Sequence, residues 1–262
     1  MRTFSTALAF LVLAVSVSGC SAKPATLEEV LADIKTKSEK TDTYTADFDM
    51  AMKTGGMSMN FAGNMQGKGK MMLMTTNMDM MQQKIAMKMH LDGSNIMWTA
   101  MDMMGTKQVM KMDMSKAKEM SEDMFPGMMP GGMGGMGGAG GMGGMQNDPR
   151  HAVEQMTQLF DLTYEGTEKL DGGDVYVLKG TMKEDAKAKL SSDGADDAAP
   201  MGMDLAEMMG ATVLKVSAED GFIRSTQMLG QDGVAWMTQT YKNIKLNEPA
   251  DDALFTYTPP EG

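Results

Sequence analysis

The chain has 262 residues, a formal net charge of −11 and 37 methionines, but only one cysteine and two histidines. This length suits one sizeable β domain with insertions, or two small domains. The acidic balance argues against nucleic acid as a partner, because phosphates attract a basic face. A single cysteine excludes disulfides within the chain, and neither histidine lies in a recognisable nucleophile or metalloenzyme motif. We therefore expect neither an enzyme nor a bound cofactor.

The first 20 residues have the pattern of a secretory signal. Arg2 precedes an apolar run at residues 7–15, which is too short to cross a bilayer but suits a signal peptide. The run ends in Val-Ser-Gly-Cys at residues 17–20, which resembles the lipobox of bacterial lipoproteins. We expect residues 1–19 to be removed and Cys20 to carry a diacylglyceryl anchor, with residues 20–25 as its tether.

This anchor predicts a protein of the cell envelope, attached to a membrane through Cys20. Ser21 follows the cysteine, and by resemblance to enterobacterial sorting rules it favours the outer membrane. The alternative is a chance cysteine after an ordinary signal peptide.

Residues 26–40 predict the first helix. Thr26 and Glu29 form a capping box, with a hydroxyl at the cap and a carboxylate three residues later. Helical spacing then relates the apolar residues Leu27, Val30, Leu31 and Ile34. One narrow apolar stripe suits a helix that lies across a sheet.

Residues 44–115 alternate between apolar and polar side chains, which is typical of β-strands with one buried face. Glycines and an Asp-Gly pair separate the runs and predict an antiparallel meander. Most of the apolar positions are methionine, a flexible side chain that recurs at promiscuous binding surfaces. We predict an apolar pocket for a ligand, formed by Phe48, Met50, Met52, Met57, Met59, Phe61, Met72, Met74, Met87, Met89, Trp98, Met110, Met112 and Met114.

Residues 126–145 consist mainly of glycine and methionine, and glycine at this density does not hold regular structure. One interpretation is an unselected linker; another is an oxidant trap or a membrane-touching segment. A third is a soft-metal site, because thioethers favour Cu(I). Its ligands would be Met133, Met136, Met142 and Met145, and Met87, Met89 and His90 would add a strand-borne site.

Further elements follow this loop. Asp148 and Pro149 predict the start of a helix, on which Val153, Met156 and Phe160 share a face. Period-two patterns and turn signals predict strands at residues 162–168 and 175–182 and more strands within 211–245. Between them lie a polar insertion at 183–200 and a short segment with further methionines at 203–209.

The order of these elements resembles the LolA/LolB lipoprotein-carrier superfamily. Two motifs carry most of the resemblance: DGSNIMW at residues 92–98 and FTYTPPEG at residues 255–262. The second is similar to the family's closing F-T-F-T-P-P-x-G. The spacing of Asn243, Asp251 and Phe255 is similar as well. The resemblance covers residues 26–115 and 148–262.

The resemblance implies an α+β, mainly antiparallel fold in one domain over residues 26–262. This fold is a strongly curved, incomplete β-barrel whose concave face is covered by helices, and family members shelter acyl chains there. The resemblance would place the methionines inside and the first and central helices over the mouth. The family's Arg-Pro pair after the second strand is absent around residues 70–77, so its arginine latch is not transferred.

The leading hypothesis is a non-catalytic envelope lipoprotein that binds or transfers acyl chains of lipids or lipoproteins. One alternative is an envelope lipoprotein that binds Cu(I). A second is a structural lipoprotein whose methionines pack a solid core.

Overall fold

The computed structural model describes residues 26–258 except for 55–56, 81–82, 95, 104–105, 114–147 and 194–209. The predicted signal peptide, Cys20, the tether and Met114 lie outside the described residues. So do the glycine–methionine loop at 126–145, with its four candidate copper ligands, and the segment at 203–209.

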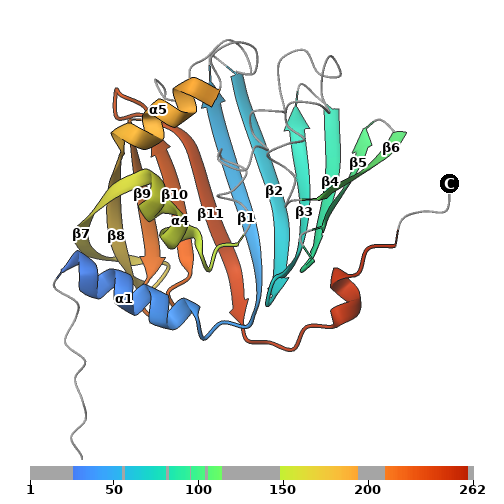
Figure 1. The fold of residues 1–262 in the computed structure, drawn as a ribbon, viewed down its shortest axis with the longest axis horizontal. Coiled ribbons are helices and arrows are strands. Elements are labelled where there is room, and N and C mark those ends of the chain that lie inside the picture. The colour runs from blue at the N-terminus through green and yellow to red at the C-terminus, as the bar shows by residue number, and fades with distance from the viewer. Residues whose placement is uncertain are drawn as a thin grey trace, which may run out of the picture.

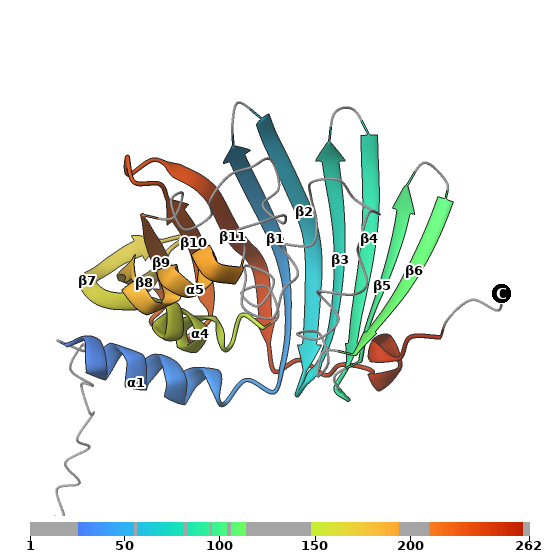
Figure 2. The ribbon, with the colours of Figure 1, turned by 45° about the horizontal axis from the view of Figure 1, so that its top comes forward.

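One antiparallel sheet of eleven strands forms the body of the molecule (Figure 1). Its order is β6-β5-β4-β3-β2-β1-β11-β10-β9-β8-β7, so the first and last strands pair near the middle. The sheet is curved and open, with β6 and β7 at separate edges (Figure 2). This confirms the predicted mainly antiparallel, curved architecture. The strands are β1 (Thr43–Thr54), β2 (Met57–Lys68), β3 (Met71–Met80), β4 (Gln83–Asp92), β5 (Ile96–Met103), β6 (Thr106–Asp113), β7 (Phe160–Leu170), β8 (Gly173–Met182), β9 (Ala211–Ser217), β10 (Ile223–Leu229) and β11 (Ala235–Leu246).

The central pairing of β1 with β11 contains an irregularity that involves the late asparagine. The register shifts between Thr45 and Asp47, and Asn243 adopts a left-handed backbone with φ of 50°, which asparagine tolerates better than most residues. The Asn243 amide donates to Asp47 Oδ2 at 2.7 Å. Hydrogen bonds from Asn243 and Asn64 lower the pKa of the Asp47 carboxyl.

The helices are α1 (Leu27–Ser38), α4 (Ala152–Leu159), α5 (Glu184–Asp193) and the 3-10 helix η3 (Asp252–Phe255). The capping box of α1 is present, with Glu29 N–H donating to Thr26 Oγ1 at 3.2 Å. The prediction that Phe160 continues the central helix is wrong, because Phe160 begins β7, although its side chain is buried. The predicted polar insertion also contains a helix, α5, which has no clear apolar stripe in the sequence.

The α-helices lie over one part of the sheet. In both views α1, α4 and α5 lie in front of the β7–β11 region, while β3–β6 extend beyond them (Figures 1 and 2). Buried Ile34 of α1, Met156 of α4 and Ala186 of α5 join one hydrophobic cluster with the sheet. Among the described elements, no α-helix lies over β3–β6 on this side of the sheet.

The C-terminal segment crosses to the opposite face. After β11 it runs past the end of β1, where Asn247 N–H donates to Thr43 O at 2.8 Å. Lys68 Nζ then pairs with Asp252 Oδ1 at 2.6 Å. Tyr257 lies against the rings of His90 and Trp98, with ring centroids 5.1 Å from each. The tail therefore covers β3–β5 from the side away from the helices.

Candidate ligand-binding face

The strand register brings the methionines of β1–β6 onto one face of the sheet. Directly opposed residues in paired strands share a face. Met65 of β2 is paired with Met74 of β3, and Met74 is paired with Met89 of β4. We call this surface the methionine face. Its described side chains include Phe61 and the methionines Met50, Met52, Met59, Met65, Met72, Met74, Met78, Met87, Met89, Met97, Met101, Met110 and Met112.

The same face continues into the helix-covered part of the sheet. Met50 of β1 is paired with Gln239 of β11, which is paired with Thr226 of β10, and Thr226 is paired with Leu214 of β9. Leu214 is in turn opposite Leu178 of β8. The inner side chains of β7–β10 are mostly branched or aromatic and are buried: Phe160, Tyr176, Leu178, Leu214, Val216 and Ile223.

Burial varies across the methionine face. Met65 is fully buried, and Met72 and Met74 each retain 3% of their exposure. Other members are only half-buried: Met59, Phe61, Met87, Met89, Met97, Met110 and Met112. Methionine has three rotatable side-chain bonds, so half-buried methionines can adjust to the shape of a partner.

Two glycines of β2 shape the boundary between the two regions. A Cβ atom on Gly63 would lie 2.8 Å from the Phe48 ring, and one on Gly67 would collide with the Tyr44 ring. The aromatic rings of β1 therefore lie across β2 where β2 has no side chains. In the register the row then continues from Gly63 to Thr76 of β3 and Met87 of β4.

Most of the predicted binding residues come together, with three exceptions. Phe48 and the other predicted methionines of β1–β6 share one face. Met57 begins β2, but its side chain is not described, and Met114 lies outside the described residues. Trp98 lies on the opposite face, because it is paired with His90 and Lys111 and follows Met97 directly in the strand. Four members were missed although they keep the same period of two: Met65, Met78, Met97 and Met101.

Trp98 belongs instead to a small cluster under the C-terminal tail. Tyr257 contacts both Trp98 and His90, and Lys111 Nζ lies 5.1 Å from the Trp98 ring centre. Burial, followed by the charge of Lys88, lowers the pKa of His90. This arrangement rules out the proposed copper site of Met87, Met89 and His90, because the histidine and the methionines face opposite ways. In the described part of the chain, no group of three or more His, Cys, Asp or Glu side chains is arranged to hold a metal ion.

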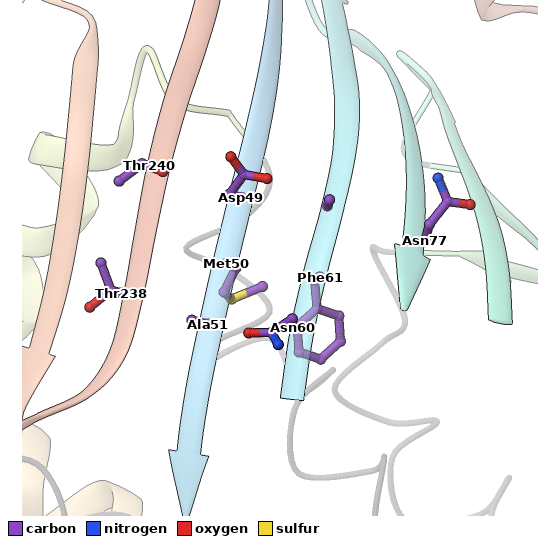
Figure 3. A pocket seen from close by; sticks show the side chains of 9 residues that line it. Asp49, Met50, Ala51, Asn60, Phe61, Asn77, Thr238 and Thr240 are labelled. Atoms are coloured by element: carbon purple, nitrogen blue, oxygen red, sulfur yellow. The ribbon is translucent and has the colours of Figure 1, made fainter. Parts of the chain in front are cut away.

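A shallow depression of about 340 Å³ also lies on the opposite face (Figure 3). Its lining comes from β11, β1, β2 and β3 and is mostly small or polar: Asp49, Ala51, Asn60, Ala62, Asn77, Thr238 and Thr240, with Met50 and Phe61. Asp49 is paired with Lys242 at 2.8 Å. Because it is separated from the methionine face by the sheet, this depression is not the predicted apolar pocket.

Arg150, which sequence reasoning did not select, connects the start of α4 to the sheet. It is buried, donates to Thr41 O at 3.0 Å and to Gly69 O, and pairs with Asp148 Oδ2 at 2.6 Å. Its guanidinium also lies 5.2 Å from the centre of the Tyr44 ring. Burial opposes the charge, but the hydrogen bonds and charge of Asp148 outweigh it and raise the pKa of Arg150. The only local signal for this role is the Asp-Pro-Arg sequence before the helix.

A separate polar network connects helix α1 to β8 and to the residue that follows β9. Tyr176 of β8 donates to Asp33 Oδ2 at 2.8 Å, and Lys37 Nζ contacts both Asp33 Oδ2 and Ala218 O at 2.5 Å. Burial, and then the hydrogen bond to Asp33, raise the pKa of Tyr176.

No helix in the described part of the chain is long and apolar enough to span a membrane.

Among known proteins, the chain is similar to several solved structures. No family model and no curated protein matches the chain. An uncharacterized conserved protein from Thermus thermophilus has a TM-score of 0.48 at 9% identity, covering 89% of this chain and 94% of that chain. Lipoprotein LppX of Mycobacterium tuberculosis has a TM-score of 0.46 at 12% identity, covering 86% of this chain and 99% of that chain.

A LolA superfamily protein from Nitrosomonas europaea is also similar, with a TM-score of 0.31 at 11% identity and coverage of 89% of this chain and 99% of that chain. All three TM-scores are below 0.5.

Proposed function

We propose that the methionine face binds acyl chains of lipids or lipoproteins and that the protein holds or transfers them without catalysis. The observation that carries this proposal is the register, which aligns the thioether side chains of six consecutive strands on one side of a curved sheet. A broad apolar surface of flexible side chains suits a ligand that is long, apolar and variable in shape.

The driving force would be burial of hydrocarbon. Each CH₂ group transferred from water contributes about 0.8 kcal/mol, so a sixteen-carbon chain gains roughly 12 kcal/mol before costs. Ordering of the ligand and movement of protein segments offset part of this gain. A bilayer offers the acyl chain similar contacts, so small differences in the fit of the face would decide the direction of transfer.

In this proposal the helices cover the part of the inner face that lies next to the methionine face. Helices α1 and α4 already pack on the inner face of β7–β11. Polar contacts of Asp33, in the middle of α1, connect that helix to Tyr176 of β8. Arg150, just before α4, donates to carbonyl groups of the segments that flank β1 and β2.

The proposal also includes the predicted location. Residues 1–19 would act as a signal peptide, Cys20 would anchor the mature chain to a membrane of the envelope, and residues 26–262 would form one domain. A carrier with this anchor would keep its acyl cargo close to the membrane surface. No observation on the described residues favours the copper alternative.

The test is mass spectrometry of lipid that copurifies with the full chain from envelope. We expect bound acyl lipid in the wild type and its loss in Met87→Asp and Met112→Asp, because a carboxylate on the face disfavours hydrocarbon. Ala86→Asp is the matched control, since Ala86 precedes Met87 and is exposed on the other face. Wild-type protein free of lipid, or full retention of lipid in both face variants, would favour the solid-core alternative.

A further inference from the structure

Thr76 is a polar residue in the middle of the methionine face. It lies in β3, between Gly63 of β2 and Met87 of β4 in the register. Met87 is followed by Met101 of β5 in the same row, and Phe48 lies on the other side of Gly63. Along its own strand, the nearest residues on the same face are Met74 and Met78, both buried.

The hydroxyl of Thr76 is buried and has no hydrogen-bond partner among the described residues. The residue keeps 3% of its exposure, and its Oγ1 atom forms no hydrogen bond within the described part of the chain. Thr212, on the same face in the helix-covered part, is fully buried and donates to Gln227 O at 3.1 Å. A threonine hydroxyl on this face therefore has a described hydrogen-bond acceptor in the helix-covered part of the sheet, at Thr212, and none at Thr76. Buried polar groups without a partner are few in native proteins and each calls for an explanation.

A buried water molecule is a poor hydrogen-bond partner for the Thr76 hydroxyl at this place. A buried water molecule forms about three hydrogen bonds to polar groups. The cross-strand neighbours Gly63 and Met87 and the strand neighbours Met74 and Met78 supply no polar side-chain atom apart from weakly accepting thioethers. An acceptor that arrives with an apolar ligand would satisfy the hydroxyl without needing further polar partners.

We infer that Thr76 is a recognition subsite for the carbonyl group of an ester- or amide-linked acyl chain, which accepts a hydrogen bond from the threonine hydroxyl. The inference rests on the proposed function and refines it, because it separates acylated ligands from plain hydrocarbon chains. Methionines lie on both sides of Thr76 along β3 and across β4. A carbonyl at the hydroxyl would thus leave apolar surface on either side for the attached chains.

The test is a competition between two lipids that differ only in whether their two chains carry ester carbonyl groups. The purified full chain is incubated with vesicles of equimolar dipalmitoyl phosphatidylcholine and its dihexadecyl ether analogue, then separated from them. Mass spectrometry gives the ester-to-ether ratio of the bound lipid. We expect the wild type to favour the ester by roughly three- to tenfold, the size of one net hydrogen bond. Thr76→Val keeps the shape and removes the donor, so its ratio should approach one.

Thr75→Val is the matched control, because it makes the same chemical change one residue earlier on the opposite face, and it should keep the wild-type ratio. A second measurement is the midpoint of thermal unfolding of the ligand-free protein. Removing an unsatisfied hydroxyl should raise the midpoint of thermal unfolding in Thr76→Val by about 2–4 °C. A lower midpoint would mean that the hydroxyl already has a partner and would overturn the inference.

The outcomes separate the inference from the proposed function. Equal binding of ester and ether lipid by the wild type would overturn the role of Thr76 and leave acyl binding standing. An unchanged ester preference in Thr76→Val would do the same. Binding of neither lipid would overturn the proposed function together with the inference.

Discussion

On β7–β10 the inner face consists mostly of branched and aromatic side chains beneath α1, α4 and α5, whereas on β2–β6 it consists mainly of methionine. The first region buries Leu178, Leu214 and Val216 completely. The second includes half-buried Met59, Met87 and Met110. Stiff side chains suit a partner that is always the same, such as a helix of the same chain. Flexible thioethers suit a partner whose shape changes.

The largest expected effect separates the two regions by stability. Leu214→Ala should lower the free energy of unfolding by about 2–5 kcal/mol, because it leaves a cavity under the helices. Met89→Ala should cost less than about 2 kcal/mol, because Met89 is only half-buried and its surroundings can adjust. Urea unfolding followed by circular dichroism measures both values. Equal costs would show that the methionine face is packed as firmly as the other region.

A second prediction concerns Arg150, which links α4 to β1 and β2 where the two regions meet. Arg150→Met should lower the free energy of unfolding by about 2–3 kcal/mol, because it removes hydrogen bonds from a buried cation and leaves Asp148 without its partner. Lys35→Met is the control, since the pair of Lys35 with Glu39 is exposed and 3.9 Å long. Its effect should stay within about 0.5 kcal/mol. A loss in the Arg150 variant no larger than in the control would exclude a connecting role for the arginine.

The smallest effect on stability should come from mild oxidation of the methionine face. Peroxide converts a thioether to a sulfoxide with release of water, and accessible methionines react first. Peptide mass mapping should find sulfoxide first at Met59, Met87, Met89, Met97, Met110 and Met112 and later at fully buried Met65 and Met228. Bound acyl lipid should fall while the circular dichroism spectrum is retained, and methionine sulfoxide reductase should restore binding. Early oxidation of Met228 would contradict the difference in cover between the two regions.

The sequence predicted the strands well because alternation is a local property. Each run of β1–β6 keeps its period of two, and the face of every methionine follows once one residue of the strand is placed. The same rule should have excluded Trp98, because Met97 and Trp98 are consecutive and so face opposite ways. The same period of two should also have placed four further methionines on the methionine face: Met65, Met78, Met97 and Met101.

Other features depended on contacts between distant segments. Helix α5 has little apolar periodicity, so its position depends on packing of Ala186 against the sheet. The role of Arg150 depends on carbonyl groups of Thr41 and Gly69, which are far away in the chain. Short-range patterns do not contain such information.

The amino-acid sequence by itself determined the strand periodicity, the capped first helix and the concentration of methionine on one side of each strand. The tertiary structure decided which strands meet, that α1, α4 and α5 pack on the β7–β11 region, and that the tail carrying Tyr257 covers Trp98 on the other face. It also decided that the Thr76 hydroxyl finds no hydrogen-bond partner in the segments that the structure describes. The reason is physical: alternation follows from the geometry of one strand, whereas register, cover and hydrogen-bond satisfaction depend on which segments the folded chain brings together.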